Sequence, residues 1–394
     1  MTGRPWDQVA AEDIARLRDA HLLRERRIIE PIDATHMRWD GREYINFSSN
    51  NYLGLTHHPR LIAATRLAAE KYGTGAGAAP LITGYGPAHA SAERAIARWK
   101  GTQAAVILPS GYQANHAAIQ TAAAIGRLGP GGVRFLVDKL AHASLIDAVR
   151  GTGEALRVFP HNHVAKLQRL LEDAPEGQLQ VVVTESIFSM DGDAADLPAI
   201  AELKQRHNFL LLLDEAHAAG VYGTAGNGLA AEMGVADAVD VTIMTLSKAL
   251  GGIGGGVCAS TVFCDALVNY GRAYLFSTSV PPMVAAGAEE AVAIVQDEPA
   301  RRHRLREISR HARERIGRTK FGIPAGDSPI IPIVLGEERA ALDAAQGLWS
   351  EGLLVMAVRP PTVPRGSSRL RVTLCSEHTD AEVEQLLACV EKLT

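Results

Sequence analysis

The sequence has few cysteines, no long apolar run and no excess of charge of one sign. Its four cysteines form neither a CxxC pair nor a zinc-ligand cluster, so they predict neither a disulfide framework nor a metal site. No stretch approaches the roughly 18 uninterrupted apolar residues of a membrane span. The first residues contain no apolar block of signal-peptide length. We therefore expect a cytoplasmic protein that has no contact with a membrane.

The charge balance excludes a further class of partner. Forty basic residues stand against 44 acidic residues, which gives a formal net charge of −4. This charge offers no general attraction to nucleic acid or to an anionic membrane. Any anionic ligand must therefore be bound by local groups. A length of 394 residues with 47% apolar content is enough for a full-sized core.

Short apolar runs alternate with amphipathic stretches between residues 46 and 280. The pattern is typical of strands wound with helices into a mostly parallel sheet, so we expect an α/β fold with its large domain over this range. Residues 1–45 are expected to form a helix that ends near Pro31 and a small strand segment. Residues 281–394 are expected to form a linking helix and a small α+β domain, with strands at 330–335, 353–358 and 369–374 and helices at 338–350 and 379–392.

One lysine stands at the end of an apolar strand and just before a glycine-rich bend. The run VDVTIMTLSKALGG places Lys248 at the carboxyl end of a strand, which is where open α/β sheets bind their ligands. A partly desolvated lysine at such a point can serve as a Schiff-base amine. A solvated loop lysine is the simpler alternative. The decision therefore depends on the residues around Lys248.

A second apolar strand, FLLLLD, ends in Asp214, and His217 follows three residues later. Burying an unpaired carboxylate is costly, so a cationic partner is expected. A metal ion or a helicase-type DEAH box would be alternatives, but the sequence has no P-loop and no further ligand cluster. The protonated pyridine ring of pyridoxal phosphate fits better, because that cofactor needs an acid on its ring nitrogen.

Two further segments suit the same cofactor. SGYQAN, residues 110–115, opens a helix after a glycine turn, and free amides at a helix N-terminus can hold a phosphate. The motif alone is weak because such turns are common, but Thr245, Ser277 and Thr278 offer further hydroxyl groups. His142 follows the strand at 133–138 and can stack on an aromatic cofactor, although a lone histidine there is more often structural.

Taken together, these segments resemble the α-oxoamine synthase family of fold-type I pyridoxal-phosphate enzymes. The resemblance implies a mostly parallel seven-stranded sheet, a small C-terminal domain and a homodimer with active sites at its interface. The matching segments cover nearly the whole chain: FSSNNYLGL (47–55), SGYQANHAAI (110–119), DKLAHASL (138–145), TESIFSMDGD (184–193), LDEAHAAGVYG (213–223), TLSKALGG (245–252), FSTSVPP (276–282) and RPPTVPRGSSRLRVTL (359–374).

The resemblance also implies a role for each matching cofactor residue. Lys248 would bind the cofactor and later take the α-proton of the amino acid, and Asp214 would pair with the pyridine nitrogen. His142 would stack on the ring, and His217 and Ser189 would contact its oxygen. The phosphate would be held by Gly111, Tyr112 and Thr245, with Ser277 or Thr278 contributed by a second subunit.

For the substrates, the resemblance assigns Arg371 to the amino-acid carboxylate, with help from Asn50, because an arginine fork binds a carboxylate bidentately. Arg24 and Thr362 would face the acyl-CoA. The implied reaction is a decarboxylative condensation of an amino acid with an acyl thioester. VRPPTVPRG is most similar to members that join L-alanine with pimeloyl-CoA or pimeloyl-ACP in biotin biosynthesis.

Other condensations of the family are alternatives, such as glycine with acetyl-CoA or succinyl-CoA, or the synthesis of a secondary-metabolite amino ketone. An aminotransferase or a silent scaffold protein belongs to a different class. One loop departs from the family, since Ala78, Ala79 and Pro80 replace a usual hydroxyl residue and its neighbours. This departure leaves the choice of substrate open. The same loop meets the G-x-G-x-x-A pattern of dinucleotide binders, but it follows a helical segment rather than a strand.

Overall fold

The computed structural model describes residues 4–393. Contacts between Cα atoms divide the chain into two compact units. The smaller unit contains the chain up to Ser49, residues Met190–Gly192 and the chain from Arg306, and the larger unit contains Asn50–Ser189 and Asp193–Leu305. This division joins the N-terminal segment to the C-terminal region, whereas the sequence pattern had suggested separate parts. It also assigns the helix after residue 281 to the larger unit.

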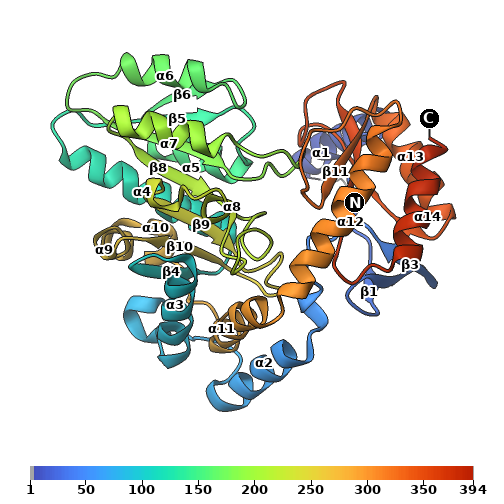
Figure 1. The fold of residues 1–394 in the computed structure, drawn as a ribbon, viewed down its shortest axis with the longest axis horizontal. Helices are drawn as coiled ribbons and strands as arrows, with labels where there is room; N and C mark the ends of the chain where they lie inside the picture. The colour runs from blue at the N-terminus through green and yellow to red at the C-terminus, as the bar shows by residue number, and fades with distance from the viewer. Residues whose placement is uncertain (1–3, 394) are drawn as a thin grey trace. The chain divides into compact units, whose positions relative to one another are not determined.

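The larger unit is built on a seven-stranded sheet with the order β4-β10-β9-β8-β7-β5-β6 (Figure 1). Strand β10 is antiparallel to both of its neighbours, and the remaining pairs are parallel. The predicted mostly parallel seven-stranded sheet is therefore confirmed. The strands are β4 Ala104–Leu108, β5 Val133–Asp138, β6 Ala155–Phe159, β7 Leu179–Glu185, β8 Leu210–Asp214, β9 Val241–Thr245 and β10 Gly255–Ala259.

Helices cover both faces of this sheet, which explains the apolar runs of its central strands. In β7, Val181 and Val183 face one core cluster, and Val182 faces the other. Helices α4, α5 and α9 pack in the first cluster, and α6 and α7 pack in the second. The helices of this unit are α2 Pro59–Tyr72, α3 Pro87–Lys100, α4 Gly111–Leu128, α5 Ala143–Thr152, α6 Val164–Glu172, α7 Leu197–Arg206, α8 Leu229–Glu232, α9 Thr261–Tyr270, α10 Arg272–Leu275 and α11 Pro282–Asp297, with short turns η1 Leu55–His57, η2 Pro80–Gly84 and η3 Ala236–Ala238.

The smaller unit contains two sheets, of orders β1-β2-β3-β12 and β11-β14-β13. Its strands are β1 Ile29–Pro31, β2 His36–Trp39, β3 Arg42–Asn46, β11 Ile330–Gly336, β12 Leu353–Leu354, β13 Met356–Val358 and β14 Ser368–Thr373. Its helices are α1 Pro5–Asp19, α13 Glu338–Ser350 and α14 Asp380–Glu391, and α12 Pro299–Gly317 begins in the larger unit and continues into the smaller one. Within residues 4–393, no helix is both long and apolar enough to cross a membrane.

Two helix predictions were wrong in their boundaries. The first helix ends at Asp19 rather than near Pro31, because His21 has a φ of 56° and the amides of Leu22 and Leu23 turn back to the Leu17 carbonyl. The linking helix expected after residue 281 is two helices, α11 and α12, which are separated at Glu298. A proline, Pro299, begins the second helix, as its fixed φ favours.

A buried ion pair lies directly behind the end of β8. Lys100, the last residue of α3, places its Nζ 2.5 Å from Glu215 Oε2, and both side chains are almost fully buried. The ammonium also donates to the Asn227 carbonyl, and Glu215 Oε1 accepts the Ala230 amide at 2.9 Å. Since the partners satisfy each other, removal of one leaves a charge buried without compensation.

We predict that Lys100→Met lowers the free energy of unfolding by about 3–5 kcal/mol. The double variant Lys100→Met with Glu215→Gln should recover much of this loss, because the glutamine is neutral and still accepts the Ala230 amide. Urea unfolding measures both variants, with Lys71→Met on the exposed surface of α2 as the control. A single variant as stable as the control would contradict the prediction.

Candidate active site

The predicted cofactor residues gather at the carboxyl edge of the large sheet. A cavity of about 250 Å³ opens where β5, β7, β8 and β9 end. Lys248, Asp214, His217, His142, Thr245, Gly111 and Tyr112 all line it, as the sequence predicted of residues that follow parallel strands. Ser110, which begins the predicted phosphate-binding segment, also lines the cavity. The remaining lining residues were not assigned from the sequence: Asn115, Ser144, Glu185, Ala216, Ile243, Met244 and Ser247.

The amine of Lys248 lies at the end of a hydrogen-bonded chain. Its Nζ is 2.9 Å from Nε2 of His217, and Nδ1 of the same ring is 2.6 Å from the hydroxyl of Tyr52. The Tyr52 hydroxyl donates to Oδ1 of Asn50 at 3.2 Å, so its oxygen is available to accept from Nδ1 of His217. The chain therefore holds the His217 ring in place and directs the Lys248 amine toward it.

Asp214 is 5% exposed and receives two amide donors. The backbone N–H of Ala216 donates to Oδ1 at 2.8 Å, and Nδ2 of Asn115 donates to Oδ2 at 2.9 Å. Neither donor carries a charge, and no cation of residues 4–393 forms an ion pair with this carboxylate in the structure. A buried carboxylate with neutral donors fits a ligand that presents a positively charged N–H.

The two ionisable groups next to Asp214, Glu185 and His142, have pKa shifts that favour their neutral forms. Glu185 pairs with Asp214 across β7 and β8, and its Oε1 accepts the His142 amide at 2.5 Å. Burial, and then the negative charge of Asp214, raise the pKa of Glu185 well above its usual range. Burial lowers the pKa of His142, although Asp214 opposes this effect. Both directions favour a neutral acid and a neutral imidazole beside the aspartate.

The first turn of α4 forms a cradle for an oxyanion. Ser110 caps the helix, since its Oγ accepts the Gln113 amide at 3.1 Å and its carbonyl accepts the Ala114 amide. The amides of Gly111 and Tyr112 have no partner within the helix and point out of its N-terminus. Thr245 lies beside them, because a Cβ on Gly111 would be 3.3 Å from its Oγ1. In this structure the Thr245 hydroxyl donates to the Gly254 carbonyl at 3.0 Å, so the two amides are the donors that remain for a phosphate.

Other predicted residues lie elsewhere. In the same chain, Gln113 donates from Nε2 to Ser277 Oγ at 3.1 Å, and Thr278 is exposed; their contribution to a second subunit stays a prediction. Ser189 is buried in the turn after β7. In the smaller unit, Arg24 donates to Thr362 Oγ1 at 3.3 Å, and Arg371 is buried in β14.

Two of the lining residues that the sequence analysis did not assign, Asn115 and Glu185, lie in positions that the sequence does indicate. Asn115 follows Gly111 by one helical turn in SGYQAN, so a helix that begins at Gly111 places both toward the same ligand. Glu185 ends the apolar strand VVVTE just as Asp214 ends FLLLLD. Ser144 had no such signal, because its role depends on contacts across the fold. Its Oγ accepts from Asn115 at 2.8 Å and contacts Nδ1 of His142 at 2.7 Å.

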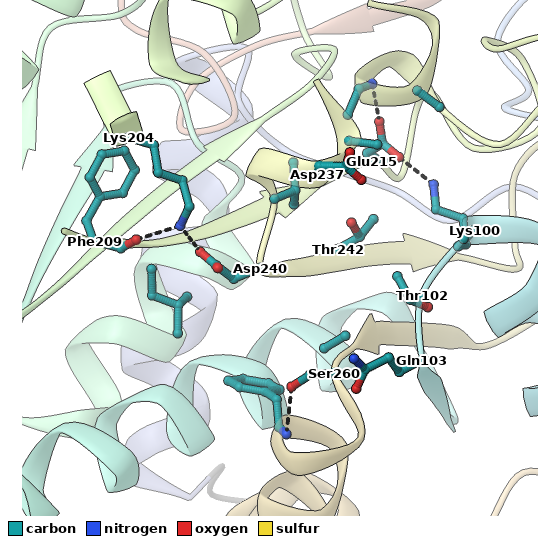
Figure 2. A pocket seen from close by; sticks show the side chains of 18 of the residues that line it. Lys100, Thr102, Gln103, Lys204, Phe209, Glu215, Asp237, Asp240, Thr242 and Ser260 are labelled. Carbon is teal, nitrogen blue, oxygen red and sulfur yellow. Dashed lines mark hydrogen bonds and ion pairs between the residues drawn. The ribbon is translucent and has the colours of Figure 1, made fainter. Parts of the chain in front are cut away.

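A larger cavity, of about 680 Å³, lies at the opposite edge of the sheet, where β7, β8 and β9 begin. Figure 2 shows that two lysines of this cavity are paired with carboxylates, Lys204 with Asp240 and Lys100 with Glu215. Lys204 also donates to the Phe209 carbonyl at 2.7 Å. Because these charges satisfy each other, the smaller cavity around Lys248 is the stronger candidate for chemistry.

The loop at residues 73–84 follows helix α2, so it lacks the strand that a dinucleotide-binding glycine motif requires. Its Ala78 carbonyl accepts a hydrogen bond from the Ser279 amide at 3.0 Å, and Pro80 begins η2, a short π-helical turn. The loop that departs from the predicted family therefore touches the segment that carries Ser277 and Thr278.

Comparisons with known proteins agree with this fold and site. Residues 42–390 match the model of the aminotransferase class I and II family, and the chain belongs to this family. Among its relatives, the 8-amino-7-oxononanoate synthase of Geobacter sulfurreducens is 39% identical over 386 residues, which cover 97% of each chain.

Two solved structures share the fold. Serine palmitoyltransferase of Sphingomonas wittichii is 32% identical with a TM-score of 0.90, and the match covers 98% of this chain and 96% of that one. The 8-amino-7-oxononanoate synthase of Francisella tularensis is 26% identical with a TM-score of 0.75, and the match covers 89% of this chain and 97% of that one. The predicted fold-type I architecture is therefore confirmed.

We predict that Gly111→Ala weakens the binding of pyridoxal phosphate by about tenfold, because the added methyl group enters the cradle beside Thr245. Binding of pyridoxal, which has no phosphate, should change little. Absorbance titrations of the apoprotein measure both affinities. Gly151→Ala is the matched control, since a Cβ there meets nothing within 4 Å. An equal loss for both ligands would contradict a phosphate role for Gly111.

Proposed function

We propose that the protein catalyses the reaction of the 8-amino-7-oxononanoate synthases to which it is similar. L-Alanine condenses with a pimeloyl thioester, carried by CoA or by an acyl-carrier protein, and the products are 8-amino-7-oxononanoate, the free thiol carrier and carbon dioxide. This reaction belongs to biotin biosynthesis. The observation that carries the proposal is the meeting of Lys248, Asp214 and the α4 cradle at one cavity, in a chain that matches a synthase over 97% of its length.

The cavity fits pyridoxal phosphate by the chemistry of its donors. Asp214 would hold the ring N–H, and the Gly111 and Tyr112 amides with Thr245 Oγ1 would hold the phosphate. Lys248 would bind the aldehyde carbon, His142 would cover the ring, and His217 and Ser189 would contact the ring oxygen. When bound, the cofactor supplies an electron sink conjugated to the α-carbon of the amino acid.

The chain's own groups then control the proton and the substrate. When not bonded to the cofactor, Nζ of Lys248 would be the base for the α-proton, and Nε2 of His217, 2.9 Å away, would orient it. Arg371 would bind the amino-acid carboxylate with help from Asn50, and Arg24 and Thr362 would bind the acyl-CoA. These four assignments rest on the family resemblance of the motifs that contain them.

A homodimer is part of the proposal. The larger unit exposes apolar side chains that a monomer would leave in water, among them Leu81 at 54%, Ile82 at 75%, Ile253 at 57% and Phe276 at 73%. Phe276 directly precedes Ser277 and Thr278, so burial of this surface by a second copy would bring their hydroxyl groups to the interface. None of the four cysteines forms a disulfide, which supports the proposed cytoplasmic location.

We predict that Asp214→Asn lowers kcat by about 100-fold or more, because a neutral amide no longer favours the protonated pyridine ring. The variant should still bind the cofactor, since the phosphate cradle is unchanged. Asp237→Asn, which changes an exposed carboxylate of the same unit, is the control. Near-normal turnover of Asp214→Asn would exclude the proposed role.

The substrate assignment is tested with alanine, glycine and serine against pimeloyl-, acetyl-, succinyl- and palmitoyl-CoA, scored by release of CoA. We expect alanine with pimeloyl-CoA to give the highest kcat/KM. Serine with palmitoyl-CoA as the best pair would instead assign the activity named for the structural neighbour with TM-score 0.90. Glycine with a short acyl-CoA would indicate another condensation of the resembled α-oxoamine synthases, with Ala78–Pro80 as the first segment to examine.

A further inference from the structure

His161 lies between two carboxylates outside the cavity. Its Nδ1 is 3.0 Å from Asp138 Oδ1, and its Nε2 is 2.7 Å from Asp193 Oδ2. An ionised carboxylate only accepts hydrogen bonds, so both ring nitrogens must carry a hydrogen to make both contacts. The geometry therefore requires an imidazolium. The Phe188 ring packs against it edge to face, with 4.3 Å between the centroids.

The residues around His161 stabilise its protonated form. Burial lowers the pKa of His161, but the hydrogen bonds and charges of Asp138, from β5, and Asp193, from the turn after β7, outweigh burial and raise it to about 10. A histidine in an unfolded chain titrates near 6.5. The ion pairs therefore contribute fully below about pH 6.5 and are lost only as the pH approaches 10.

The two carboxylates lie next to two segments that the proposed function assigns to the cofactor, the loop of His142 and the turn of Ser189. Asp138 ends β5, and its Oδ1 also accepts the Leu140 amide at 2.8 Å. It thus begins the short loop that leads to His142. The backbone N–H of Asn162, next to His161, donates to Asp138 Oδ2 at 3.0 Å and adds a second contact to this loop.

Asp193 ends the turn that carries Ser189. The Phe188 amide donates to the Asp193 carbonyl at 2.9 Å and closes this turn. Asn162 Nδ2 donates to the Ala194 carbonyl at 2.9 Å, just beyond it. His161 and its neighbour therefore hold the loop of His142 and the turn of Ser189 from one point.

We propose that His161 is a positioning residue that ties the loop of His142 to the turn of Ser189, and so holds both side chains in place for the cofactor. The inference rests on the proposed function, because it takes pyridoxal phosphate as the ligand of this cavity. His161 does not line the cavity, and neither do Asp138 and Asp193, its partners, so it acts through the two loops. We therefore expect substitution of His161 to affect the affinity for the cofactor more than the rate of turnover.

The first test compares His161→Gln with His163→Gln. Glutamine at position 161 is uncharged and cannot bridge both carboxylates as an imidazolium does. The apoprotein should therefore bind pyridoxal phosphate about tenfold more weakly. His163 is exposed and only caps α6, where its Nδ1 accepts the Lys166 amide, so His163→Gln should bind like the wild type. Absorbance titration of each apoprotein gives the affinities. Unchanged affinity in His161→Gln, or an equal loss in both variants, would overturn the proposal.

Asp193→Asn keeps the size of the side chain and remains informative where His161→Gln does not fold. With one carboxylate removed, His161 should lose its proton at lower pH. The affinity for pyridoxal phosphate relative to wild type should then fall as the pH rises from about 6 to about 9. A constant ratio would overturn the positioning role. A wild-type protein that takes up no pyridoxal phosphate would instead refute the proposed function, and the role that rests on it.

Discussion

The buried carboxylate of Asp214 is the constraint on which the rest of the site depends. Its side chain is buried, and its two hydrogen-bond donors are uncharged amides from Asn115 and Ala216. A buried anion of this kind is stabilised when a cation pairs with it. Burial favours the neutral form of the neighbouring acid, Glu185, and of the neighbouring imidazole, His142. The proposed pairing of Asp214 with a protonated ring nitrogen is based on this environment.

Much of this arrangement could be predicted because strands in parallel sheets place the residues that follow them at one edge. The run VRFLVD has the bounds of β5, and Asp214 and Lys248 lie where their apolar strands indicated. The contacts among side chains could not be predicted in this way. Ser144 and His161 matter through residues far along the chain, and no local pattern records which carboxylate or amide a side chain will meet after folding.

Helix ends were harder to predict for a related reason. Periodicity continues through Leu22 and Leu23, but a single residue in the left-handed region, His21, ends α1. Substrate choice is the least predictable property. The same fold is shared by an 8-amino-7-oxononanoate synthase and a serine palmitoyltransferase, so the shared core alone does not determine the acyl group.

Asp214 and Glu215 are consecutive in the chain, yet one faces the cavity and the other pairs with Lys100 behind it. A single peptide unit therefore connects an anchor of the fold with the acid of the candidate active site. Selection for heat resistance and selection for turnover would act on the same few atoms here. Substitutions of residues around Lys100 should consequently change the chemistry at the proposed cofactor site, even though none of these residues contacts the cofactor.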